Sequence, residues 1–272
     1  MLVHRKWVLL APGCVGLCSR SFSSSSDRPP RSTCSIYGRP KKNDNESLQC
    51  TREDGTDGSR HYVYRDNGGN VLYSFPSVTT ILNSTRSTSD MFRMKVWTKG
   101  QIEKYGIERF KANRLRIINE GKAFHAEIAD FLASNSSSSF TDSNTSEYFN
   151  SIRELLINDI TDVKLCEENV LHEELGYAGT VDCLAKYKGK TCVIDWKTSQ
   201  SPKSDLFDYP LQAVAYAGAI NNMGQHKVDN LLIVVTCSGT PPLVKHFNVK
   251  ECTELWEQWI DRLEYYQTKS YN

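Results

Sequence analysis

Two strand-like runs joined by a tight turn place the strongest constraint on the fold of this chain. The runs cover residues 181–188 and 191–197, and the turn is formed by Lys188-Gly189. A two-residue turn fixes the register of an antiparallel hairpin, so each residue has a defined partner on the other strand. On one face the expected partners are Asp182 with Asp195, Leu184 with Val193, and Thr180 with Lys197.

The opposite face of this predicted hairpin is entirely apolar. Its expected pairs are Val181 with Trp196, Cys183 with Ile194, and Ala185 with Cys192. An apolar face needs other elements packed over it, and the helical periodicity found before and after the hairpin can supply them. We therefore expect an α/β fold in which helices flank a sheet.

The charged face brings two carboxylates and a lysine together. Opposed residues have Cβ atoms about 4.5–5.5 Å apart, so Asp182, Asp195 and Lys197 should converge. The carboxylates repel unless a cation lies between them, and Mg²⁺ prefers such oxygens. A metal beside a lysine can hydrolyse phosphodiesters. Solvated strand charges are the alternative reading, but Asp195 follows the apolar residues 192–194, where burial of an unpaired acid is costly.

Three short motifs follow one another around this hairpin. They are Gly179-Thr180-Val181-Asp182, Val193-Ile194-Asp195-Trp196-Lys197-Thr198, and Gln212 with Tyr216. In this order they resemble the motifs of the PD-(D/E)xK nuclease superfamily, in its RecB-like branch. Val181 replaces the proline in the superfamily's name, at a position that varies widely. The resemblance implies a restriction-endonuclease-like core, which is a central mixed β-sheet flanked by helices, with an N-terminal helical extension.

The resemblance also implies a role for each matching residue. The catalytic residues would be Asp182, Asp195 and Lys197, and the supporting residues would be His125, Gln212 and Tyr216. Gln212 and Tyr216 are four residues apart and share one helix face. His125 matches the histidine on the helix before the sheet, which contacts the metal or the substrate.

The expected cofactor is Mg²⁺, with Mn²⁺ as the alternative. Its ligands would be Asp182, Asp195 and His125, and Glu173 or Glu174 would also face it. Some RecB-like relatives hold an iron–sulfur cluster with four cysteines. Cys166, Cys237 and Cys252 lack the tight clustering of such sites, so we predict no cluster here.

The N-terminal residues have the composition of a mitochondrial transit peptide. The first 26 residues contain three basic side chains, no acid and a serine-rich run. We assign residues 1–42 to a transit peptide and basic linker, residues 43–60 to a disordered linker, and residues 61–272 to the nuclease domain. Within that domain, residues 61–145 are the hairpin and helical part, and residues 146–272 are the catalytic core.

Local patterns predict the remaining elements. A hairpin is expected over residues 61–74, a helix capped by Ser77, helices over 89–105, 107–132 and 146–160, strands from 164 onward, a helix over 210–220, strands over 231–236 and 244–249, and a helix over 252–267. No apolar run reaches the eighteen or more residues needed to cross a bilayer, so we expect no membrane span. The positions of Cys183 and Cys192 inside predicted strands suggest reduced core thiols.

A basic segment offers a surface for nucleic acid. Residues 1–42 carry eight Lys/Arg and one Asp, so the rest of the chain has a net charge of −6. Within it, residues 92–122 hold nine basic and three acidic side chains, interleaved with aromatics. This pattern suits single-strand binding, although such aromatics more often face a core. The expected DNA-binding residues are Lys111, Arg114, Arg116 and Trp97.

The resemblance, together with the composition of the N-terminus, implies a metal-dependent exonuclease that digests single-stranded DNA in the mitochondrial matrix, within mitochondrial DNA maintenance. The expected substrates are single-stranded DNA and DNA flaps. We expect a monomer, with other mitochondrial DNA replication proteins as further partners. A structure-specific flap endonuclease and a non-catalytic single-strand-binding module remain as alternatives.

Overall fold

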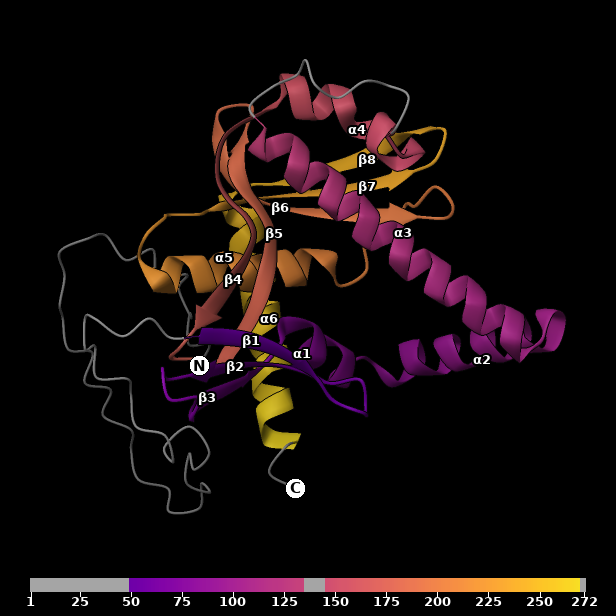
Figure 1. Ribbon diagram of the computed structural model, residues 1–272, viewed down its shortest axis with the longest axis horizontal. Helices are drawn as coiled ribbons and strands as arrows, with labels where there is room; N and C mark the ends of the chain where they lie inside the picture. The colour runs from indigo at the N-terminus through magenta and orange to yellow at the C-terminus, as the bar shows by residue number, and fades with distance from the viewer. Residues whose placement is uncertain (1–48, 135–144, 270–272) are drawn as a thin grey trace.

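A five-stranded mixed sheet forms the centre of the computed structural model, which describes residues 49–134 and 145–269 (Figure 1). Its strands, in spatial order, are β4 (Ile160–His172), β5 (Tyr177–Tyr187), β6 (Lys190–Ser199), β7 (Asn230–Cys237) and β8 (Thr240–Phe247). Strands β6 and β7 are parallel, and the other neighbours in this sheet are antiparallel. Helix α5 (Tyr209–Met223) connects the two parallel strands, because a parallel pair needs a crossover.

The hairpin of β5 and β6 confirms the predicted register over its outer part. Lys188 and Gly189 both have positive φ angles, 48° and 81°, as a primed two-residue turn requires. The ladder runs from Tyr187 opposite Lys190 to Cys183 opposite Ile194, and it includes Leu184 opposite Val193.

The predicted backbone pairs beyond Ile194 are wrong. Asp182 with Asp195, Thr180 with Lys197 and Val181 with Trp196 do not belong to the ladder. Instead, the Trp196 N–H donates to Asp182 Oδ2 at 2.9 Å. A side chain has therefore replaced a strand carbonyl as the acceptor, and the two strands separate at the point where the charged residues begin.

The sheet has an apolar core on each face. Helices α1 (Val78–Ser84), α5 and α6 (Val249–Lys269) cover one core, and α3 (Ile107–Ala133) and α4 (Glu147–Asn158) cover the other. Five of the six residues of the predicted apolar face lie in the second core: Cys183, Ala185, Cys192, Ile194 and Trp196. Val181 lies in the first core instead, because strict alternation is lost where the β5–β6 ladder ends.

A second sheet contains β1 (Gln49–Asp54), β2 (Arg60–Arg65) and β3 (Val71–Pro76). The β2–β3 pair confirms the predicted hairpin. The predicted disordered linker is wrong from Gln49 onward, because β1 pairs with β2 along its whole length. This edge strand buries little apolar surface, and contacts such as Arg65 with Glu53 at 2.6 Å accompany its backbone pairing. Composition alone therefore did not reveal it.

The predicted helices are confirmed within a few residues at each end. Ser77 caps α1, and its Oγ accepts a hydrogen bond from Thr80 N at 3.0 Å. Helix α2 (Thr88–Tyr105) has no buried residue, and the buried residues of α3 all come from its C-terminal part. We call α2 with residues 107–120 of α3 the arm, and Figure 1 shows it projecting from the body. A Trp97–Phe110 edge contact, with ring centroids 6.2 Å apart, joins its two helices.

Some sequence predictions fall outside the described ranges, including the transit peptide, residues 43–48 of the linker and residues 135–144 of the predicted nuclease domain. The six cysteines within those ranges are free, and Cys183 and Cys192 are buried as predicted. None of the helices described in Figure 1 combines the length and apolarity needed to span a bilayer.

Candidate functional site

The charged residues of β5 and β6 meet residues of β4 and α3 at the inner end of the central hairpin. Asp182 lies on β5, and Asp195 and Lys197 lie on β6. Helix α3 packs against β4 and β6, and brings His125 to the same place. The site thus depends on three neighbouring strands and one helix that covers them.

Three potential metal ligands form a compact group. His125 Nδ1 lies 3.1 Å from Glu167 Oε1 and 3.8 Å from Asp182 Oδ1. One ligand atom from each residue lies within 4.8 Å of the others. We call His125, Glu167 and Asp182 the ligand cluster. Asp195 is not a member, although the charges of Asp182 and His125 act on it from nearby.

Glu167 was not identified from the sequence. The β4–β5 register pairs Cys166 with Cys183 and Glu168 with Val181, which places Glu167 across from Asp182. The two acids expected instead, Glu173 and Glu174, lie in the turn between these strands. A correct β4–β5 register would have identified Glu167, but no short turn signature in the sequence specifies that register.

Asp195 and Lys197 form a buried ion pair beside the cluster. Lys197 Nζ lies 2.7 Å from Asp195 Oδ1, and the side chains are 17% and 1% exposed. The other oxygen, Asp195 Oδ2, is buried and has no hydrogen-bond partner among the described residues. Burial raises the pKa of Asp195 to about 7, opposed by the charge of Lys197. Burial alone would lower the pKa of Lys197, but the charges of Asp195 and Asp182 raise it overall.

Neighbouring acids also shift the pKa of His125. Burial alone would lower the pKa of His125, but its hydrogen bond to the Glu167 carboxylate and the charge of Asp182 outweigh burial and raise it. The negative charge of the cluster therefore favours the protonated imidazole. A cation bound there would replace this proton, because metal binding needs neutral imidazole and deprotonated carboxylates.

The donor set suits a hard divalent cation. Carboxylate oxygens are the ligands that Mg²⁺ and Mn²⁺ prefer, and an imidazole is compatible with Mn²⁺. A buried carboxylate oxygen without a partner, Asp195 Oδ2, is costly unless a cation or donor approaches it. The residues present therefore fit a metal held by the ligand cluster, with Asp195 next to it.

The two predicted supporting residues on α5 lie together at the site. Gln212 Nε2 donates to Tyr216 Oη at 2.9 Å. Tyr216 is buried, which raises its pKa, and the charges of Asp182 and Asp195 act in the same direction. Its ring packs on Gly179, where a Cβ would lie 2.4 Å from the ring atom Cε1. This close approach explains the glycine of the first motif.

Tyr209 is a second residue that the sequence did not indicate. Lys197 Nζ lies 5.2 Å from the centre of its ring. Tyr209 begins α5 and packs partly against the first core. Only the crossover from β6 to α5 brings it to the lysine, because no motif spacing links the two residues.

The predicted DNA-binding residues lie on the arm rather than with the cluster. Trp97 is 61% exposed, and Lys111 pairs with Glu108 at 3.1 Å. Arg114 lies over the Phe110 ring at 5.9 Å. Arg116 donates to Gln200 Oε1 at 3.0 Å, so it connects the arm to the loop that follows Lys197.

Comparisons with known proteins point toward nucleases. No family model matches the chain. Three similar curated proteins are each named mitochondrial genome maintenance exonuclease 1. The Homo sapiens protein is 38% identical over 205 residues, which is 72% of this chain and 59% of that protein. The proteins of Xenopus tropicalis and Mus musculus are each 36% identical, covering 72% and 73% of this chain and 58% and 61% of their own lengths.

This chain therefore spans 58–61% of the length of these curated relatives. A crystal structure of a Eubacterium rectale protein is also similar to the fold. It is 12% identical, covers 68% of this chain and 69% of its own, and has a TM-score of 0.28.

Proposed function

We propose that this chain is a metal-dependent nuclease that digests single-stranded DNA from an end and acts in mitochondrial DNA maintenance. The observation that carries the proposal is the buried Asp195–Lys197 pair beside the ligand cluster. The names of the three relatives support the exonuclease activity and the mitochondrial role. The motif order and the mixed sheet support membership of the RecB-like branch of the PD-(D/E)xK superfamily.

Residues of this chain can position the groups that react. Mg²⁺ or Mn²⁺ bound by His125, Glu167 and Asp182, with Asp195 beside it, would neutralise phosphate charge and make a bound water more acidic. Lys197 has three N–H donors and gives one to Asp195 Oδ1, which leaves two for a phosphate oxygen or the attacking water. Asp195 keeps Lys197 protonated and fixes the direction of its side chain, because the ion pair is buried.

The arm supports a role in holding the strand. Its exposed aromatics include Trp97, and its basic residues include Lys111, Arg114 and Arg116. Aromatic faces stack on any base while basic side chains follow the phosphates, so this surface suits binding without sequence preference. Replacing Lys111, Arg114 and Arg116 with Gln should weaken single-strand binding and flatten its salt dependence. Unchanged affinity and slope, measured in Ca²⁺, would place the strand elsewhere.

The function is tested by assaying the purified protein on end-labelled DNA and RNA, single- and double-stranded, with and without Mg²⁺ or Mn²⁺. Asp195→Ala and Lys197→Ala should abolish cleavage while the circular dichroism spectrum stays unchanged. Lys190→Ala removes an exposed positive charge at the far end of the same strand and serves as the control. Near wild-type cleavage by either site variant would contradict the assignment of the site.

Substrates with blocked ends separate the possible modes of cutting. An exonuclease should fail on a strand with both ends blocked, whereas a flap endonuclease should still cut it. Binding without cutting in either metal would instead indicate a non-catalytic module. Matrix location is tested separately, by fusing residues 1–42 to a reporter and following its import; a cytosolic reporter would refute a transit peptide.

A further inference from the structure

An exposed aromatic residue follows the catalytic strand at a short distance from Lys197. Phe207 lies between β6 and α5 and is 62% exposed, although its side chain is large and apolar. Its φ angle is 48°, a left-handed conformation that is uncommon for an aromatic residue. Its N–H donates to Asp205 Oδ1 at 2.8 Å, which holds the turn in this shape. The fold thus presents this ring to solvent.

A chain of contacts links this ring to the catalytic lysine. The Phe207 and Tyr209 rings meet edge to face, with centroids 6.4 Å apart. Lys197 Nζ lies 5.2 Å from the centre of the Tyr209 ring. Phe207 is therefore one aromatic ring removed from the group that we expect to contact the phosphate.

Basic side chains accompany the two rings. Lys203 Nζ lies 5.7 Å from the centre of the Phe207 ring. Lys197 Nζ lies over the Tyr209 ring in the same way. The charge of Arg86, which precedes the arm, also acts on Tyr209. Flat apolar faces with cations at their edges match the alternation of bases and phosphates in a single strand.

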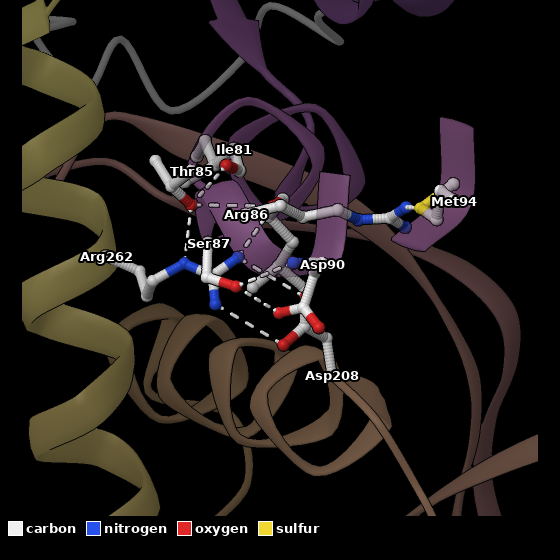
Figure 2. A network of polar contacts seen from close by, with 9 residues as sticks. Ile81, Thr85, Arg86, Ser87, Asp90, Met94, Asp208 and Arg262 are labelled. Atoms are coloured by element: carbon white, nitrogen blue, oxygen red, sulfur yellow. Dashed lines mark hydrogen bonds and ion pairs between the residues drawn. The ribbon is translucent and has the colours of Figure 1, made fainter. Parts of the chain in front are cut away.

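The backbone between Phe207 and Tyr209 is also held in place. Asp208, between the two aromatic residues, accepts hydrogen bonds from Arg262 at 3.3 Å (Figure 2). Arg262 in turn binds Leu82 and Thr85 at the end of α1. A ring carried by a fixed backbone loses less freedom on binding than a ring on a mobile loop.

We propose that Phe207 and Lys203 form a subsite for one nucleobase of single-stranded DNA and its phosphate, adjacent to the bond that is cut. This inference rests on the proposed function, since it places the substrate at Lys197. Phe207 stacks on the base, and Lys203 neutralises the neighbouring phosphate. The subsite fixes the strand end relative to Asp195 and Lys197.

Stacking can be detected directly with 2-aminopurine, whose fluorescence falls when it stacks. Single-stranded oligonucleotides carry the probe at successive positions from one end and bind the full chain in Ca²⁺. The wild-type protein should quench the probe most strongly at one or two adjacent positions. Phe207→Leu should lose this quenching and bind about 5- to 150-fold more weakly, the range for one stacked base. Phe207→Trp should retain both properties.

Two controls separate stacking from a general effect on the fold. Tyr265→Leu removes another exposed aromatic ring, on α6, and should change neither quenching nor affinity. An abasic position in the oligonucleotide removes the base and leaves the protein intact. Placed at the quenched position, it should weaken binding to wild type but add nothing to the defect of Phe207→Leu. Lys203→Gln should reduce the salt slope of binding by about one.

The outcomes distinguish this proposal from the nuclease function. If wild type cuts DNA but Phe207→Leu shows wild-type quenching and affinity, the subsite is overturned and the nuclease stands. If wild type quenches the probe through Phe207 but does not cut in Mg²⁺ or Mn²⁺, the subsite stands and the nuclease function fails. Independent effects of the abasic position and Phe207→Leu would also overturn the subsite.

Discussion

At the scale of single residues, the carboxylate of Glu167 completes the ligand cluster. It lies 3.1 Å from His125, across the strands from Asp182. Its own backbone has a φ angle of 51°, so β4 departs from regular strand geometry where this side chain enters the site. Irregular strand positions of this kind often redirect a side chain toward a functional site.

Glu167→Gln removes one negative oxygen from this cluster and should weaken binding of Mn²⁺ by about tenfold or more, as loss of a ligating or orienting group commonly does. Isothermal titration calorimetry measures the change. The neighbouring Glu168→Gln removes the same charge outside the cluster and serves as the control. Equal metal affinity in the two variants would exclude Glu167 as a ligand.

Gly179→Ala tests the contact between the first motif and α5. The new methyl group would approach the ring of Tyr216 to 2.4 Å, and that ring is buried. Overpacking of this kind costs about 1–3 kcal/mol of the free energy of unfolding, measured in urea. Gly100→Ala, in the exposed helix α2 with nothing within 4 Å, should instead gain about 0.5–1 kcal/mol. If Gly179→Ala leaves the free energy of unfolding unchanged, the Tyr216 ring can move away from the new methyl group.

At the scale of elements, the arm starts from a fixed point at the end of α1. Arg262 of α6 donates to Thr85 Oγ1 and to Leu82 O, both at 2.6 Å, and to Asp208 at the start of α5 (Figure 2). Leu82 O is one of the last carbonyls of α1, which the helix itself leaves without a partner. Arg262 therefore connects three helices at the base of the arm.

Arg262→Met keeps the apolar stem of this side chain but removes the hydrogen bonds that it donates to Thr85, Leu82 and Asp208. We expect a loss of about 1–3 kcal/mol in the free energy of unfolding. Amide hydrogen exchange should accelerate at the end of α1 and at the start of α5. Lys250→Gln, which removes an exposed charge elsewhere on α6, should have little effect. Unchanged exchange at both places in Arg262→Met would show that the network does not hold the base of the arm.

At the scale of the whole molecule, the central sheet separates two cores, and His172 lies at the end of β4 beside the first. Its ring is 7% exposed and lies near Tyr177 and Trp256, with centroids 5.2 and 6.1 Å away. Its Nδ1 accepts a hydrogen bond from Leu175 N at 3.3 Å, which needs an unprotonated nitrogen. Burial lowers its pKa from 6.5 to about 4.

This depressed pKa makes stability depend on pH. Between pH 6.5 and 4 the unfolded chain binds the proton that the folded chain excludes, so stability falls as the pH falls through this window. The contribution of His172 to the loss between pH 7 and 5 is about 2 kcal/mol. His172→Asn keeps an acceptor without titrating, so it should be less stable at pH 7 but lose less on acidification. Parallel pH profiles of urea unfolding for the two proteins would contradict this.

By itself, the sequence determined the elements whose signals are local. The hairpin turn at Lys188-Gly189, the cap at Ser77 and the periodicity of the helices each depend on a few neighbouring residues, and the structure confirms them. The aspartate and lysine of β6 that we propose as catalytic were also predicted in this way, because residues two apart on a strand share a face. Their ion pair follows from that spacing.

Features that depend on pairing between distant segments of the chain were decided only by the tertiary structure. Strand β1 is too polar to be recognised alone, and it exists because β2 offers an edge. Glu167 enters the ligand cluster through the register of β4 on β5, and Tyr209 reaches Lys197 through the crossover to α5. Pairing between distant segments depends on how the whole chain packs, and the residues near each position in the sequence carry no separate signal for it.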